Sequence, residues 1–251
     1  MFGGQHPNVG VVKKIFSQVS ELSPLGLDVE LVLVSTGDAH YPSCDSLTIY
    51  RIDKVPISDF FGQIRRARKI GKIFGKMMES LGPDDVPYHR YPSLLPLYCP
   101  HKYLRWFRTC KVVTEHQTKE LEEFKLHGDA FSYWSEYLFG NLLRKQSDAV
   151  VGVTDEITQY EITRAGDPNK PYITIGNGFL VQSVPIRQAP YYNSDDLHLL
   201  CVANVSRWHG LDRLLQGLAI YHGMPKVILH IAGDGAELPH LQQLTEELGF
   251  S

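Results

Sequence analysis

The chain has 251 residues, 43% hydrophobic and 11% aromatic, which is enough to bury one large core or two small ones and argues against a disordered protein. Its formal net charge of −3 is too small to indicate an acidic or a basic partner. The four cysteines are scattered, which excludes a regular disulfide frame and favours free thiols in a reducing compartment: Cys44, Cys99, Cys110 and Cys201. No segment has the order of a secretory signal, and no apolar run reaches the roughly 18 residues of a membrane span. Composition therefore predicts a cytoplasmic globular protein.

Apolar runs typical of strands alternate with longer helical patterns along the chain. Strands are predicted at 28–35, 47–52, 86–92, 110–116, 148–154, 172–177, 197–204 and 226–233. Helical patterns lie near 9–23, 58–80, 131–147, 154–165, 209–221 and 236–249. This alternation predicts β-α-β units and parallel sheets with helices on both faces.

A linker over residues 180–196 interrupts the alternation, with two prolines and little hydrophobic period. We therefore predict one α/β domain over residues 1–179 and a second, partial one over residues 197–251. The first begins with "GGQHPNVG" and a helix instead of a strand, and the second has only two strands and two helices. Such a half-domain buries little of its sheet, so we expect the chain to be a fragment of a longer protein.

The stretch "NVSRWHG" (204–210) joins a predicted strand to a predicted helix. Ligands of open parallel sheets bind beyond the carboxyl ends of the strands, where helix amides favour an anion such as a diphosphate. Gly210 permits close approach of the backbone, and His209 and Arg213 offer charge-assisted hydrogen bonds. The alternative is that Trp208 is a packing residue and that His209 only caps the loop.

Two further corners have the same position in the predicted sheets. Gly233, Asp234 and Gly235 form a tight strand-to-helix turn in "HIAGDGAEL", which is either a second ligand contact or a plain turn. Glu115 and His116 end the strand in "VVTEHQT" and are expected to face a cleft, where a histidine can act in hydrogen bonding or acid–base chemistry. The alternative there is an exposed loop histidine.

Residues 60–78, "FFGQIRRARKIGKIFGKMM", form a basic amphipathic helix without an acidic residue. Such a helix either lies on an anionic membrane surface or packs its apolar stripe on the core. No metal constellation is found, and the motifs of α/β-hydrolases, P-loop enzymes and dinucleotide-binding proteins are absent from the sequence. No metal and no nucleic acid are therefore expected as partners.

The corners, in this order and spacing, resemble glycosyltransferase family 4, and more narrowly its bacterial exopolysaccharide and capsule enzymes. The stretches that carry the likeness span nearly the whole chain: the glycine-rich start, "YHRYP", "TEHQT", "SDAVVGVTDEITQYE", "IGNGF", "VANVSRWHGLDRLLQGL" and "LHIAGDGAELPHLQQLTEELGF". The resemblance implies the GT-B fold, with two Rossmann-like domains, of which residues 1–179 are the acceptor side and residues 197–251 are part of the donor side. It also implies transfer of a sugar, with retention, from a nucleotide-sugar donor to a glycan or lipid-linked acceptor, without a metal.

The resemblance assigns roles residue by residue. His116 matches the acceptor-side histidine and is the catalytic candidate. The donor-binding candidates are Gly3, Gly4, Asn204, Arg207, His209, Gly210, Arg213, Gly233, Asp234 and Gly235. The family usually has an arginine and a lysine where Asn204 and His209 stand, so Arg207 and Arg213 are the candidates to supply the missing charge. The family's pair of glutamates, eight positions apart, falls beyond residue 251.

Two other functions stay open at this point. The chain is either an active transferase, or a fragment of one, or a catalytically inactive GT-B-like module that binds nucleotides or acts as a scaffold. An unrelated nucleotide-binding α/β enzyme such as an epimerase is disfavoured because the dinucleotide turn is missing.

Overall fold

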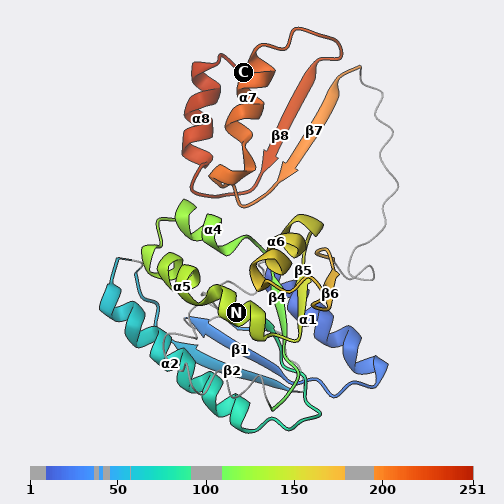
Figure 1. Cartoon of the computed structure of the whole chain (residues 1–251). Coiled ribbons are helices and arrows are strands. Elements are labelled where there is room, and N and C mark those ends of the chain that lie inside the picture. Colours follow the sequence, from blue (N-terminus) through green and yellow to red (C-terminus); the bar gives the residue numbers. More distant parts are fainter. Residues whose placement is uncertain are drawn as a thin grey trace. The chain divides into compact units, whose positions relative to one another are not determined.

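The computed structural model describes residues 10–36, 40–41, 46–56, 58–91, 109–178 and 195–250. They divide into two compact units, Met1–Pro185 and Ile186–Ser251 (Figure 1). The predicted turn at Gly3 and Gly4 and most of the predicted linker lie outside the described residues.

The first unit contains, in its described part, two sheets of parallel strands. β1 (Leu31–Thr36) pairs with β2 (Leu47–Ile52), and the second sheet has the order β3 (Tyr88–Arg90), β4 (Val113–His116), β5 (Ala149–Gly152) and β6 (Tyr172–Thr174). The helices are α1 (Gly10–Leu22), α2 (Phe60–Glu79), α4 (Glu120–Leu126), α5 (Ala130–Gln146) and α6 (Asp155–Ala165), with a 3-10 turn, η1 (Ser23–Leu25). Because all strands are parallel, their carboxyl ends meet at one edge of each sheet.

Local sequence explains where the helices of this unit begin. The side chains of Asp59, Asp129 and Thr154 each accept a hydrogen bond from a backbone amide three residues on, in the first turns of α2, α5 and α6. Such caps satisfy amides that the helix itself leaves unpaired. Gly166 ends α6 in the left-handed conformation, at φ +66°.

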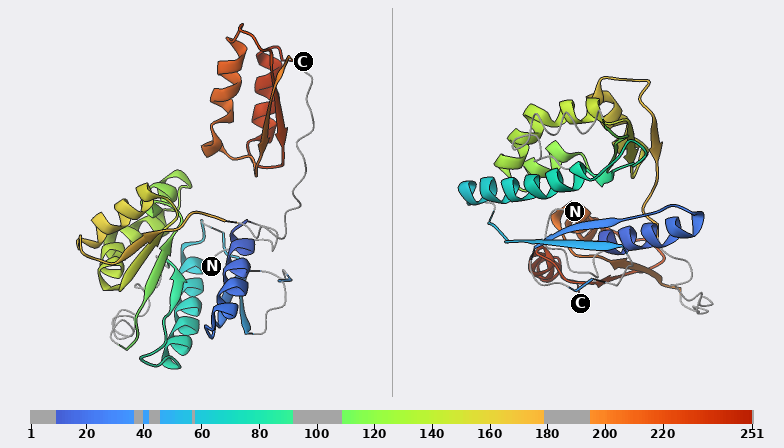
Figure 2. Two further views of the ribbon diagram at one scale, coloured as in Figure 1. Left: turned by 90° about the vertical axis from the view of Figure 1, so that its right-hand side faces the viewer. Right: turned by 90° about the horizontal axis from the view of Figure 1, so that it is seen from below.

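Helix α2 joins the two sheets of the first unit into one core. Its Ile70 and Met78 pack in a cluster with Val34 of β1, Ile52 of β2 and Val112 before β4. Two views of the chain show α2 running beside these strands (Figure 2). The apolar stripe of α2 therefore faces the core, which confirms one of the two readings of the basic helix, and five of the six cations of the helix are exposed.

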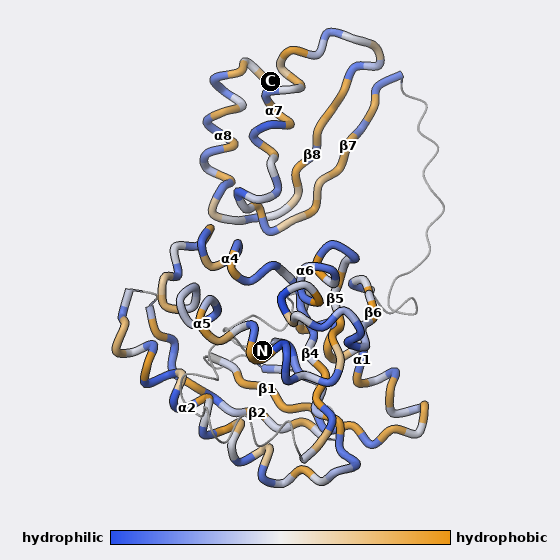
Figure 3. Tube along the Cα trace, in the orientation of Figure 1, coloured by the Kyte–Doolittle hydropathy of each residue, from blue (hydrophilic) through white to orange (hydrophobic). Residues whose placement is uncertain are grey.

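The second unit is a pair of parallel strands with two helices. β7 (Leu197–Val202) pairs with β8 (Val227–Ala232), and η4 (Arg207–His209), α7 (Leu211–Ala219) and α8 (Leu238–Glu247) complete it. Hydrophobic and hydrophilic positions alternate along both helices (Figure 3). Their core residues are Leu211, Leu215 and Leu241, which pack with Leu229 and Ile231 of β8.

All eight predicted strands and all six predicted helices are present among the described residues, and their bounds agree to within a few positions. Helix α4 was not predicted. In the second unit as described, helices cover only one face of the sheet, as expected for a half-domain with two strands and two helices. There α7 and α8 pack on one face, while Leu200 and Val202 on the other face are largely exposed. Among the described helices, none is long and apolar enough to cross a membrane.

Candidate functional site

The loops that follow β7 and β8 are joined to each other through their backbones. The Val205 amide donates to the Asp234 carbonyl oxygen at 2.7 Å, and the Glu237 amide donates to the Val205 carbonyl oxygen at 3.3 Å. Val205 itself is fully buried. The two predicted donor-side corners thus form one structure, which we call the donor corner (residues 204–213 and 233–235).

The two glycines of the Gly-Asp-Gly turn are required by this close approach. Gly233 has φ +149° and Gly235 φ +154°, a region that other residues rarely adopt. A Cβ atom at Gly233 would lie 1.9 Å from the Ala203 carbonyl oxygen, and one at Gly235 would lie 2.1 Å from the Val205 carbonyl oxygen. The turn is therefore more than a generic connection, because it holds the loop after β7 in place.

The polar residues of the donor corner are exposed. Asn204, Arg207, Arg213 and Asp234 all lie at the surface of the unit. Gly210, at φ +64°, turns the chain into α7, so that the first amides of this helix are directed to the same end of the strands. Helix amides and the guanidinium groups of Arg207 and Arg213 at this corner favour an anion, whereas Asp212 in the first turn of α7 and Asp234 oppose it.

His209 caps its own loop, as one of the two readings of the corner requires. Its Nδ1 accepts a hydrogen bond from the Ser206 amide at 3.1 Å. Nε2 is then the ring nitrogen available to a ligand. Trp208 is 60% exposed, so it is not the core packing residue that the same reading expected.

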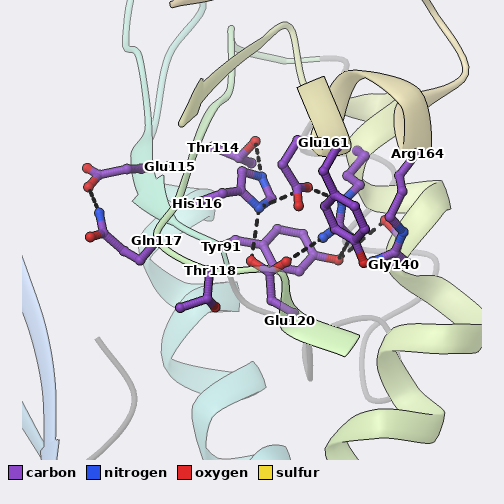
Figure 4. A network of polar contacts seen from close by, with 12 residues as sticks. Tyr91, Thr114, Glu115, His116, Gln117, Thr118, Glu120, Gly140, Glu161 and Arg164 are labelled. Carbon is purple, nitrogen blue, oxygen red and sulfur yellow. Dashed lines mark hydrogen bonds and ion pairs between the residues drawn. The ribbon is translucent and has the colours of Figure 1, made fainter. Parts of the chain in front are cut away.

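His116 lies inside the first unit and not at its surface. Its Nδ1 is 3.0 Å from a carboxyl oxygen of Glu120 and 3.0 Å from one of Glu161, and its Nε2 is 3.2 Å from the Thr114 hydroxyl (Figure 4). The ring stacks on Tyr91 with a centroid distance of 4.6 Å. The expectation that His116 faces a cleft is therefore wrong within this unit, because helices α4 and α6 close over the end of β4 and leave the imidazole 0% exposed.

Arg144 of α5 holds this network together. It donates to Glu120 at 2.8 Å, to Glu136 at 2.5 Å, to the Tyr91 hydroxyl at 2.9 Å and to Glu161. Its guanidinium also lies over the Tyr91 ring, 4.3 Å from the centroid. Arg164 adds a second bond to Glu136, at 2.5 Å. We call this set, with His116, the buried ionic network.

The charges of the buried ionic network require a shared proton. Three carboxyl groups (Glu120, Glu136 and Glu161) surround two guanidinium groups, and a net buried charge is costly. Desolvation raises the pKa of Glu120 and of Glu161 to about 7, against the opposing attraction of Arg144. Desolvation also lowers the pKa of His116 to about 4, so the imidazole is neutral at neutral pH.

Three of these side chains also offer donor atoms to a cation. Ligand atoms of His116, Glu120 and Glu161 lie within 4.8 Å of one another. Arg144 already bonds both carboxylates, however, and its charge would repel a divalent ion. Three carboxylates and two guanidinium groups give the buried ionic network a net charge of −1. One bound proton neutralises this charge, whereas a divalent ion would make the network positive.

Glu115, the other residue expected to face a cleft, is also buried, at 5% exposure. It accepts hydrogen bonds from Lys14 of α1 at 2.8 Å, from the Tyr88 hydroxyl at 2.7 Å and from Gln117. Burial, followed by the charge of Glu115, raises the pKa of Tyr88. This cluster ties α1 to β3, through Tyr88, and to the carboxyl end of β4.

The structure brings together the residues that sequence reasoning predicted for the donor corner, and it shows partners of His116 that sequence reasoning missed. Glu120, Glu136, Arg144, Glu161 and Arg164 come from three helices and share no short motif. A usable signal was present in α5, where Glu136 and Arg144 lie eight positions apart, about two helical turns, and so share a face with Gly140.

Comparison with known proteins gives a likeness in fold to a solved structure. No family model matches the chain, and no curated protein matches it. A solved structure, the lipopolysaccharide outer core galactosyltransferase WaaB in its apo form, matches with a TM-score of 0.61 at 17% sequence identity. The match covers 98% of this chain and 64% of that one, so the chain spans about two thirds of the length of that protein. The likeness confirms the predicted α/β fold class, GT-B-like with parallel sheets in two units.

Proposed function

We propose that the chain is a glycosyltransferase, or part of one, that transfers a sugar from a nucleotide-sugar donor to a glycan or lipid-linked acceptor in polysaccharide synthesis. Retention at the anomeric carbon and independence of a metal belong to the same proposal, as the resemblance to glycosyltransferase family 4 implies. The carrying observation is the donor corner, in which glycines required by the fold hold two strand ends together beside exposed cations. The likeness to a galactosyltransferase of the same fold supports it.

The proposed role of the donor corner is to stabilise negative charge on the leaving group. When the bond between the anomeric carbon and the diphosphate breaks, negative charge develops on the leaving diphosphate. In the proposed complex, amides at the start of α7, with Arg207, Arg213 and Nε2 of His209, bind that charge. Asn204 contributes only a neutral amide at a position where the family usually has a cation.

The buried ionic network has a supporting role in this proposal. With no exposed surface on its ring, His116 acts as a positioning residue that fixes the end of β4 against α4 and α6. Direct contact of His116 with an acceptor stays a prediction from the family resemblance.

Calorimetric titration of the complete protein, with whatever the gene encodes beyond residue 251, against UDP, GDP and ADP tests the donor corner. We expect binding of at least one nucleotide, weakened about 10- to 100-fold by Arg207→Ala or Arg213→Ala, because each loses a hydrogen bond to a charged group. His209→Ala should weaken binding as well. Lys226→Ala, which removes an exposed cation of the same unit outside the corner, is the matched control. Absence of heat with all three nucleotides refutes the proposal.

A catalytically inactive binding or scaffolding module is the second candidate. It is favoured by Asn204 and His209, which replace the two charges usual in the family. Nucleotide binding without sugar transfer, in a chain extended by whatever the gene encodes beyond residue 251, would support this candidate. Transfer of label from a nucleotide sugar would exclude it.

Peripheral contact with the inner face of the cell membrane, through residues 60–78, completes the proposal. Six cations of α2 lie in this segment, and five of them are exposed: Arg65, Arg68, Lys69, Lys72 and Lys76. Polybasic surfaces of this kind are attracted to anionic lipid headgroups.

A further inference from the structure

Helix α5 buries mainly polar residues and exposes most of its large apolar ones. The face that packs on the first unit carries four polar residues, Ser132, Ser135, Glu136 and Arg144, beside Gly140 and a single large apolar residue, Leu143, all buried. The opposite face carries Trp134 and Tyr137, each 57% exposed, with Leu138 63% and Leu142 41% exposed. A surface helix normally shows the reverse pattern. Among the residues that the structure describes, no apolar partner covers this outward face, although its composition favours one.

The outward residues of α5 form one continuous stripe. Trp134, Tyr137, Leu138, Asn141, Leu142 and Lys145 are spaced as i, i+3, i+4, i+7, i+8 and i+11, which places them on one helix face about 17 Å long. The aromatic rings contact one another, with 5.7 Å between the centroids of Trp134 and Tyr137. The stripe contains no acidic residue.

The start of α2 joins this stripe to a row of cations. The ring of Phe60 lies 5.4 Å from that of Phe131, at the start of α5, and 5.8 Å from that of Phe61, which is 74% exposed. From Phe61 the exposed positions of α2 continue as Arg65, Arg68, Lys69, Lys72 and Lys76, also on one helix face. Aromatic and cationic stripes thus meet at the amino-terminal ends of the two helices.

We infer that α5 is the element that inserts into an anionic lipid surface, while α2 supplies the electrostatic attraction. This deepens the proposed membrane contact and rests on it. The apolar side of α2 is buried in the core through Ala67, Ile70 and Met78. Of its large apolar side chains, only Phe60 and Phe61 are exposed enough to enter a lipid surface. Tryptophan and tyrosine favour the headgroup region of a bilayer, and leucines beside them reach the acyl boundary. Charge complementarity with the α2 cations selects an anionic lipid surface over an uncharged one.

Flotation of the full chain with vesicles tests the inference. The probes are vesicles of phosphatidylcholine alone and vesicles of phosphatidylcholine with phosphatidylglycerol at about 2:1, and binding is expected only to the anionic ones. The double variant Trp134→Ser/Tyr137→Ser should bind them on the order of tenfold more weakly, because two rings no longer leave water. Arg65→Gln/Lys72→Gln should weaken binding about 25-fold, since each cation near the surface contributes about fivefold.

Matched controls lie elsewhere in the first unit. Tyr172→Ser on β6 removes an aromatic side chain that is 51% exposed, and Lys13→Gln on α1 removes an exposed cation. Both should bind vesicles as the unmodified chain does. Insertion itself is read from quenching of tryptophan emission by brominated acyl chains, which we expect in the unmodified chain and not in Trp134→Phe.

Each other outcome overturns the inference in a distinguishable way. If only the cation variant weakens binding, α2 holds the membrane electrostatically and α5 does not insert. If the unmodified chain binds neither vesicle but forms dimers that Trp134→Ser/Tyr137→Ser dissolves, the stripe covers a second copy of this chain. If it does neither, the stripe has no lipid partner. Nucleotide calorimetry on the same variants reports separately on the proposed transferase, because the donor corner belongs to the other unit.

Discussion

Replacement of Arg144 by methionine is the sharpest test of the buried ionic network. The guanidinium is fully buried and bonds three carboxyl groups and the Tyr91 hydroxyl. Methionine fills a similar volume but donates no hydrogen bond, so the variant leaves Glu120 and Glu161 buried without their cation. Removing one partner of a buried ion pair costs about 3–5 kcal/mol, because the other charge stays desolvated.

The expected shift of the urea midpoint follows from this loss of free energy. With a urea dependence of about 2 kcal/mol per molar, a loss of about 4 kcal/mol lowers the midpoint of unfolding by roughly 2 M urea. Lys145→Met is the matched control, since Lys145 is the next residue of α5 and is exposed. A surface change of this kind should alter the free energy of unfolding by less than about 0.5 kcal/mol.

The penalty of Arg144→Met should also depend on pH. Without the arginine, burial raises the pKa of Glu120 and Glu161 above the value of about 7 that they have beside it. Such groups favour the folded state when protonated, so the loss should be smaller at pH 5 than at pH 8. The assay is urea unfolding of the full chain, followed by circular dichroism at both pH values. A loss below about 1 kcal/mol, or a larger loss at pH 5 than at pH 8, refutes the network as described.

Two further predictions concern the unmodified chain and the donor corner. Because burial raises the pKa of Glu120 and Glu161 from 4.5 in the unfolded chain to about 7, their contribution to stability is present below pH 4.5 and is lost as pH rises through 7. Urea midpoints should therefore fall between pH 6 and pH 8 as these groups titrate over about a unit on either side of 7, and a flat profile would contradict the shared proton. In the second unit, Gly235→Ala should destabilise by about 2–4 kcal/mol, because φ is +154° and the added Cβ meets the Val205 carbonyl oxygen. Gly217→Ala in α7, where nothing lies within 4 Å of an added Cβ, should instead stabilise by about 0.5–1 kcal/mol, and equal effects of the two would contradict the assigned turn.

The elements and the donor corner could be predicted from local pattern, and the environment of His116 could not. Strand and helix positions follow from hydrophobic period, and the Gly233–Gly235 turn follows from residues that permit unusual φ. The polar residues at the end of β4 predicted an edge that faces solvent. Whether that edge is exposed depends on helices α4 and α6, which follow β4 in the sequence. Glu120 follows His116 by four residues in a short helix that was not predicted, and Glu161 arrives with α6.

Local sequence pattern also fails to predict which face of helix α5 is buried. Its apolar stripe, taken alone, predicts a core face, because periodicity records which residues share a face and not where that face points. The structure places Arg144 inside because it finds Glu120 on α4 and Glu161 on α6, and it places Glu136 inside because it pairs with Arg144 and with Arg164 of α6. Only the pairing of these charges makes their burial tolerable. No local signal could supply that information.

In the donor corner, the atoms that fix the shape of the loops differ from the side chains proposed to bind a nucleotide. Stability and the proposed binding can therefore be changed independently. The shape of the corner depends on Gly233, Gly235 and the buried Val205, through backbone hydrogen bonds and a close approach that no side chain could replace. Asn204 is exposed and could be changed without cost to that shape. A change of charge at residue 204 therefore alters the electrostatics of the corner without disturbing the fold. Asn204→Arg should then leave the unfolding midpoint unchanged and strengthen nucleotide binding by about tenfold or more, the value of one charge-assisted bond. Unchanged affinity in that variant would mean that a diphosphate does not reach residue 204.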